Sequence, residues 1–148
     1  MLSNEIKELR KSGKLDEALQ MANQALEAEP NNIWNKRAIS WVYYDYLKVY
    51  ASPDSYEAFK DYLVKIKELN FLEGEEMLFD NCAWQIGKIV YALQKMDNVD
   101  YQKINALFEL IKEFHFTKSS EAYSFIYKAF HKGYKNWKNY IEFAEWWN

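Results

Sequence analysis

Turn-forming residues are scarce in this sequence: four glycines and two prolines are spread over 148 residues. Antiparallel sandwiches and barrels use such residues at their hairpins, so an all-β fold is disfavoured. The scarcity also excludes collagen-like and low-complexity chains. A chain of this length buries about two-thirds of its unfolded surface, so it needs no disulfide or metal to hold a core. We therefore expect a single all-α domain over residues 1–148.

The segments between these turn residues show helical periodicity. In residues 15–28 the apolar side chains recur at the spacing of one helix face, as Leu15, Ala18, Leu19, Ala22, Ala25 and Leu26. Gly13 is expected to end the preceding helix and Pro30 to end this one. The same pattern along the chain predicts eight helices in four antiparallel pairs, at about 3–28, 33–69, 75–114 and 119–147.

Three helix boundaries are predicted from single residues. Ser52 precedes Pro53, an order typical of an N-cap followed by a first turn, so a helix should start there. Gly133 should break the helix that starts at 117–121 and runs to about His131. Glu75 should lie in the first turn of the helix at 75–95, where a carboxylate interacts favourably with the helix dipole.

Two stretches within the first 70 residues resemble the tetratricopeptide repeat family. Gly13-Lys-Leu-Asp-Glu-Ala18, followed by Ala25 and Pro30-Asn-Asn, is similar to the second helix of such a repeat. Ile39-Ser40-x-x-Tyr43 and Ala58-x-x-x-Tyr62 stand at the family's Leu-Gly-x-x-Tyr and Ala-x-x-x-aromatic positions. The resemblance implies helix pairs that stack as a right-handed superhelix.

The resemblance covers about 65 residues and has departures within them. Lys36 and Ala22 stand where aromatic residues are usual, and residues 47–55 have the character of an insertion. Beyond residue 70 only the rhythm of helix pairs continues. An up-down helical bundle is therefore the structural alternative to the superhelix.

The long aromatic helix at 33–50 carries the first candidate binding surface. In the register that the tetratricopeptide resemblance implies, a concave groove is lined by Trp34, Arg37, Trp41, Tyr44 and Asp45. Trp, Tyr and Arg supply most of the binding energy at protein interfaces. The alternative is that the two tryptophans fill wide gaps between helices.

A second resemblance rests on a longer run of aromatic residues. Trp34-Asn-Lys-Arg-Ala-Ile-Ser-Trp41-Val-Tyr-Tyr-Asp-Tyr46, with the later Glu121-Ala-Tyr-Ser-Phe125, looks like an uncharacterised bacterial helical family. Its members stand at the start of larger proteins linked to conflict systems and mobile elements. The resemblance implies an accessory module that precedes further domains.

The segment 127–140 is the second candidate surface, because it contains four lysines and five aromatic rings without one acidic residue. This composition is typical of a platform for single-stranded nucleic acid. Its candidate residues are Lys128, Lys132, Lys135 and Trp137. The alternative is an amphipathic helix with buried rings and solvated lysines.

The chain ends in Tyr140-Ile-Glu-Phe-Ala-Glu-Trp-Trp147, which lacks the polar face of a capping helix. Trp146 and Trp147 are therefore expected to cover a neighbouring surface. That surface would belong to a second copy of the chain or to a continuation of it beyond Asn148.

Little of the sequence suggests catalysis. Cys82 is the only cysteine, lies among apolar helix positions and is expected in the core. His115 and His131 lack a second metal ligand at helical spacing, and the chain has no Gly-rich phosphate loop. We expect no enzyme activity, no metal and no cofactor.

The net charge of −3 generates no global attraction to nucleic acid, and no apolar run is long enough for a membrane span. The single cysteine fits a reducing compartment. With the helix stacking and groove that the tetratricopeptide resemblance implies, these features predict a cytoplasmic protein-interaction or scaffold module that binds a peptide or partner helix and could self-associate. A nucleic-acid-binding accessory domain is the alternative.

Overall fold

The computed structural model describes residues 2–71, 74–134 and 140–147, and within these ranges it is all-α. Its helices are α1 (Leu2–Lys11), α2 (Leu15–Ala28), α3 (Ile33–Val49), α4 (Tyr56–Glu68), α5 (Glu76–Gln94), α6 (Tyr101–Ile111), α7 (Glu121–Tyr134) and α8 (Tyr140–Trp147). A short 3-10 turn, Pro53–Ser55, precedes α4. The prediction of an all-α fold is confirmed.

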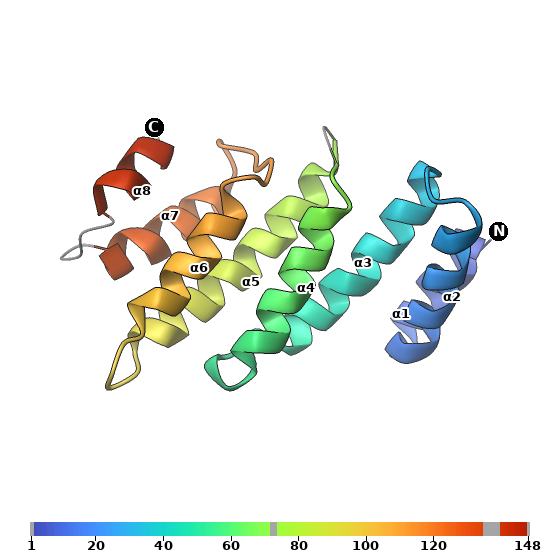
Figure 1. The fold of residues 1–148 in the computed structure, drawn as a ribbon, viewed down its shortest axis with the longest axis horizontal. Coiled ribbons are helices and arrows are strands. Elements are labelled where there is room, and N and C mark those ends of the chain that lie inside the picture. Colours follow the sequence, from blue (N-terminus) through green and yellow to red (C-terminus); the bar gives the residue numbers. More distant parts are fainter. Residues whose placement is uncertain (1, 72–73, 135–139, 148) are drawn as a thin grey trace.

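The helices lie side by side in two layers along the long axis of the molecule (Figure 1). In that view α2, α4 and α6 lie nearer the viewer, and α1, α3 and α5 lie behind them. We call α1, α3, α5 and α7 the odd-helix layer. Successive helices along the chain alternate between the two layers, because short loops join antiparallel neighbours.

The packing order changes between the two halves of the chain. In the N-terminal half α2 packs against α1 and α3, and α3 packs against α4, so each helix contacts its sequence neighbours. In the C-terminal half α5 makes its most extensive contact with α7 and only a limited one with α6. The direct packing between the two helices of the predicted pair at 75–114 is thus much less extensive than that between α5 and α7.

Gly87 explains the close approach of α5 and α7. A Cβ atom added to Gly87 would lie 2.4 Å from Cδ2 of Phe125, so only glycine leaves room for that ring. Phe125 then packs against Trp84 and Tyr91, with ring centroids 5.0 and 5.4 Å away. The Phe125 ring of α7 thus packs directly on the backbone of α5 at Gly87.

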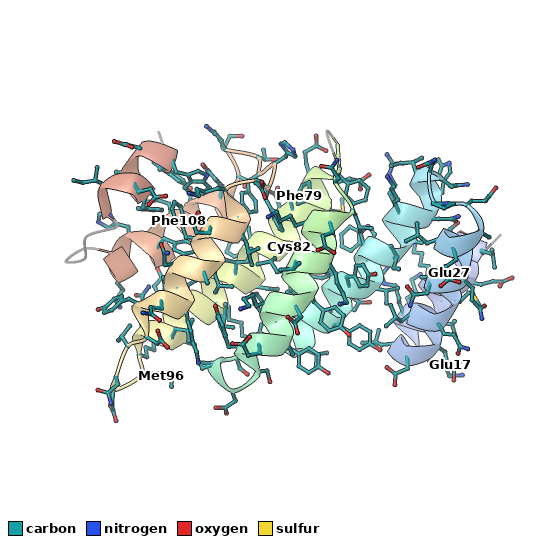
Figure 2. The ribbon with its side chains drawn as sticks, in the orientation of Figure 1. Glu17, Glu27, Phe79, Cys82, Met96 and Phe108 are labelled. Carbon is teal, nitrogen blue, oxygen red and sulfur yellow. The ribbon has the colours of Figure 1, made fainter. Side chains whose placement is uncertain are left out.

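The core consists of two clusters of buried residues. The smaller one joins α1, α2 and α3 through Ile6, Ala18, Ala22, Ile39, Val42 and Tyr46. The small side chains of α2 let its neighbours approach closely. The larger cluster runs from the end of α3 to α8. Figure 2 shows Phe79, Cys82 and Phe108 between the helices, whereas Glu17 and Glu27 lie on the outside of α2.

Tyrosines of α3 and α4 connect the two clusters. Tyr62 of α4 stacks on Tyr46 of α3 and on Tyr50, the C-cap residue of that helix, with ring centroids 4.9 and 6.0 Å away, and it also contacts Tyr43. The Tyr46 hydroxyl donates to the carboxylate of Asp16 on α2. Many of the aromatic rings in the sequence are accounted for by such contacts between helices.

Side-chain caps set three helix starts, at Asn32, Asp100 and Ser120. The Asn32 side chain accepts from the Trp34 and Asn35 amides, at 2.9 and 3.3 Å, and Asp100 caps α6 in the same way. Gly13 ends α1 with a φ of 76°, as predicted.

One predicted start is confirmed in position, and two predicted boundaries are wrong. Ser52 is the N-cap residue and Pro53 stands in the first turn, as predicted, although that turn is 3-10, the Ser52 side chain makes no cap hydrogen bond, and α4 follows from Tyr56. Gly133 lies inside α7, since packing of that helix outweighs the roughly 1 kcal/mol cost of an internal glycine. Glu75 lies outside α5, at its N-cap position.

Candidate functional site

Trp34 is the most exposed tryptophan of the described residues, with 60% of its surface accessible. It lies in the first turn of α3, which the Asn32 cap holds in place. The guanidinium carbon of Arg37, one turn further along, lies 5.0 Å from the centroid of the Trp34 ring. The prediction that Trp34 faces an open surface is consistent with this placement.

Arg37 is held by Glu75, a residue 38 positions away at the start of α5. The Arg37 Nε donates to Oε1 of Glu75. The Glu75 side chain is only 9% exposed, whereas that of Arg37 is 40% exposed. The carboxylate is thus covered, and the guanidinium faces the surface beside Trp34.

A second arginine–carboxylate–tryptophan arrangement lies two turns further along α3. Arg10 of α1 donates from Nε to Oδ2 of Asp45 at 2.7 Å, and its guanidinium carbon lies 5.5 Å from the centroid of the Trp41 ring. Both members of this ion pair are mostly covered. Asp45 therefore fastens α1 to α3 and offers little charge to a ligand.

These residues form one stripe of α3, at positions 34, 37, 41 and 45. Their partners come from α1 and from the start of α5, whereas Tyr43 and Tyr46 contact Tyr62 of α4. The stripe therefore belongs to the face of the odd-helix layer that points away from α4.

Tyr44 was predicted to line the same groove, and this prediction is wrong. Its ring is buried in the larger cluster, where it meets Trp41 edge-on at 5.7 Å. Its hydroxyl accepts from Nε2 of Gln85 on α5 at 3.3 Å, and burial raises the pKa of the phenol. The contact with Gln85 holds this ring between α3 and α5.

The described part of segment 127–140 separates its rings from its lysines. Phe130 is fully buried, and Tyr127 is half-buried with Trp147 4.3 Å away. Lys128 and Lys132 are exposed on the opposite side of α7. Lys135 and Trp137 lie outside the described residues, so the predicted platform is visible only in part.

Trp146 and Trp147 pack within the chain. Trp147 stacks on Tyr123 of α7 at 4.2 Å, and Trp146 meets Phe108 of α6 edge-on at 5.5 Å. Both rings are half-buried. The two rings were expected to cover a second copy of the chain or a continuation of it. Residues of α6 and α7 supply much of the surface that they cover.

The single cysteine and the two histidines differ in their exposure. Cys82 is fully buried, as predicted, and burial raises the pKa of its thiol. His115 is exposed and His131 stacks on Tyr127. The described residues contain no group of three or more His, Cys, Asp or Glu side chains that could hold a metal ion.

Sequence reasoning missed a row of residues on α5. Trp84 is 41% exposed and Lys88, one turn along, is exposed beside it. The signal was present in the sequence, because residues 81–96 contain no Asp or Glu. No family motif marks this stretch, and its neighbour α7 begins only 27 residues after the end of α5 along the chain.

None of the described helices is both long enough and apolar enough to cross a membrane. Comparison with protein-family models, with curated proteins and with solved structures finds no match to this chain. Functional arguments therefore depend on the geometry of these surfaces.

Proposed function

We propose that this chain is a non-catalytic protein-interaction or scaffold module. The α3 stripe of Trp34, Arg37 and Trp41 would bind a peptide or a partner helix. The proposal includes a tetratricopeptide-like stacking of the first helices, with the stripe in its concave face, and a cytoplasmic location. The partner could also be a second copy of the chain.

The exposed ring of Trp34 carries the proposal. A tryptophan that keeps 60% of its surface accessible leaves a large apolar area in water, and such rings are frequent anchors at interfaces. Arg37 is already fixed beside it by Glu75, so less side-chain freedom is lost on binding. The pair thus has the character of a preformed anchor.

The test is selection of peptides from a random display library on the immobilised chain. Peptides that use the stripe should lose at least tenfold in affinity for Trp34→Ala and for Arg37→Ala, as expected for anchor residues. Trp84→Ala is the matched control, because that ring is also exposed but lies on α5. Far-UV circular dichroism should show unchanged helicity in all three variants.

Two results would contradict the proposal. Selected peptides that bind Trp34→Ala as tightly as the wild type would show that the stripe is not the binding surface. If no peptide is selected, and the chain also sediments as a monomer at all concentrations, neither peptide binding nor self-association can be its function.

A further inference from the structure

The contact between α5 and α7 creates a second surface on the odd-helix layer. Because Gly87 lets Phe125 sit against the α5 backbone, Trp84 and Tyr91 lie on the two sides of that ring. Trp84 is the exposed member of this row, whereas Phe125 and Tyr91 are half-buried. The row therefore has one accessible ring, that of Trp84, beside the two half-buried rings of Phe125 and Tyr91.

Three exposed lysines flank the rings: Lys88 on α5 and Lys128 and Lys132 on α7. None of them makes an ion pair with any described residue. Lys132 instead places its Nζ 5.9 Å from the Tyr91 ring centroid. Residues 81–96 and 122–134 contain no Asp or Glu, so the acidic side chains of these two helices lie only at their N-terminal ends, as Glu76 and Asp80 of α5 and Glu121 of α7.

A hollow of about 460 Å³ opens beside Trp84. The residues that line it include the aromatic Trp84 and Phe125, the polar Ser124, and the charged Lys128 and Glu121. This combination matches a nucleobase, which presents an aromatic face for stacking and polar edges for hydrogen bonds. An acidic peptide would meet repulsion from Glu121 in the same hollow.

We propose that the α5–α7 surface binds single-stranded nucleic acid. One base stacks on Trp84 with its edge toward the hollow, and the phosphates lie along Lys88, Lys128 and Lys132. This binding goes beyond the peptide recognition proposed for α3 and uses a different part of the odd-helix layer. Segment 127–140 was expected to bind nucleic acid with its own rings and lysines. In this proposal its described rings pack inward, its lysines Lys128 and Lys132 contact phosphates, and the stacking ring is Trp84 of α5.

The test is fluorescence anisotropy with a labelled oligothymidylate of about 12 nucleotides, titrated at low and at physiological salt. Contacts with three phosphates predict a slope of about −2 for log K against log salt. Trp84→Ala should weaken binding by about 5- to 140-fold, the range for loss of one stacked base, and Trp84→Phe should recover part of it. Tryptophan fluorescence should be quenched on binding in the wild type only.

Charge variants test the phosphate contacts. The double variant Lys88→Glu/Lys128→Glu should abolish binding, and Lys88→Gln/Lys128→Gln should reduce the salt slope by more than half. Lys65→Glu, an exposed lysine of α4 in the other layer, is the matched control and should leave both quantities nearly unchanged. Circular dichroism confirms that each variant is folded.

The outcomes separate this proposal from its rivals. Oligothymidylate binding that is absent at low salt, or unchanged in the double charge variant, would overturn it. An oligoglutamate peptide that binds as tightly and is indifferent to Trp84→Ala would show a general anion surface instead. Trp34→Ala should leave oligonucleotide binding intact, so the peptide proposal for α3 can fail or hold independently.

Discussion

Arg37 of α3 donates an ion-paired hydrogen bond to Glu75, the residue that caps α5 with a left-handed backbone conformation. Glu75 has a φ of 61°, a region that non-glycine residues adopt only at a cost of roughly 1–2 kcal/mol. The loop before α5 thus places a carboxylate where it fixes Arg37 beside Trp34. The same residue joins two helices of the odd-helix layer and orients the candidate anchor.

The backbone conformation of Glu75 predicts an unusual order of stability for two variants. Glu75→Ala loses the ion pair and retains the strain, whereas Glu75→Gly loses the ion pair and relieves the strain. We expect the glycine variant to be more stable than the alanine variant by about 1 kcal/mol. Urea unfolding followed by circular dichroism measures the difference.

Glu76 provides the control for this comparison. It is exposed and lies in the first helical turn of α5, so alanine there should be more stable than glycine by up to about 1 kcal/mol. The same order at both positions would show that Glu75 does not have a left-handed backbone.

Gly87 predicts a strong dependence of stability on one methyl group. Gly87→Ala places a Cβ 2.4 Å from the Phe125 ring, an overlap that α5 and α7 can relieve only by moving apart. Overpacking of this kind costs about 1–3 kcal/mol, and the gain in helix propensity returns at most about 1 kcal/mol. A net loss is expected in urea unfolding.

A smaller residue at 125 should reverse part of this loss. The double variant Gly87→Ala/Phe125→Leu is expected to be more stable than the sum of its single changes by at least about 0.5 kcal/mol. Gly13→Ala is the control: a Cβ added there meets no atom within 4 Å, and although the φ of 76° makes the alanine costly by itself, its effect should combine additively with that of Phe125→Leu. If the effects of Gly87→Ala and Phe125→Leu on stability were additive, α5 and α7 would not approach closely here.

The sequence predicts what is decided locally. The bounds of α2 follow from its apolar spacing and from Gly13 and Pro30, and the structure gives that helix the expected range of 15–28. Gly133 misleads, because the cost of an internal glycine is small compared with the burial of neighbours such as Phe130. Local signals fail where long-range packing supplies more free energy.

The orientation of helix faces depends on partners distant in sequence. Tyr44 and Tyr46 are two residues apart on α3, yet both are buried because α5 covers one and α2 with α4 cover the other. Periodicity alone cannot identify those partners. The ion pair between Arg37 and Glu75 is equally invisible to it, because 38 residues separate the two side chains.

The packing of α5 on α7 could have been suspected from one residue. Gly87 lies in the middle of a long apolar helix, where glycine is costly unless another element approaches the backbone. Which element approaches, however, follows only from the three-dimensional arrangement. The surface of Trp84, Lys88 and Lys128 is therefore a product of tertiary structure that no single segment encodes.

The buried tyrosines predict that the fold loses stability at alkaline pH. Burial raises the pKa of Tyr56 to about 12, with smaller contributions from the nearby carboxylates of Glu57 and Asp100, and burial also raises that of Tyr46. In the unfolded chain both phenols ionise near 10.0. Above that pH the folded state binds more protons than the unfolded state, so the free energy of unfolding must fall as pH rises.

Tyr56→Phe isolates the contribution of one phenol. The variant loses the hydrogen bond from the Tyr56 hydroxyl to the Lys103 carbonyl, 3.0 Å long, so at pH 8 it should be less stable by about 1 kcal/mol. Between about pH 10 and 12 its stability should fall less steeply than that of the wild type, by up to about 1.4 kcal/mol per pH unit. Urea unfolding at several pH values measures both quantities, and the offset at pH 8 serves as the internal control. Parallel stability curves up to pH 12 would mean that Tyr56 ionises as readily in the folded protein as in the unfolded chain, and that its ring is open to water.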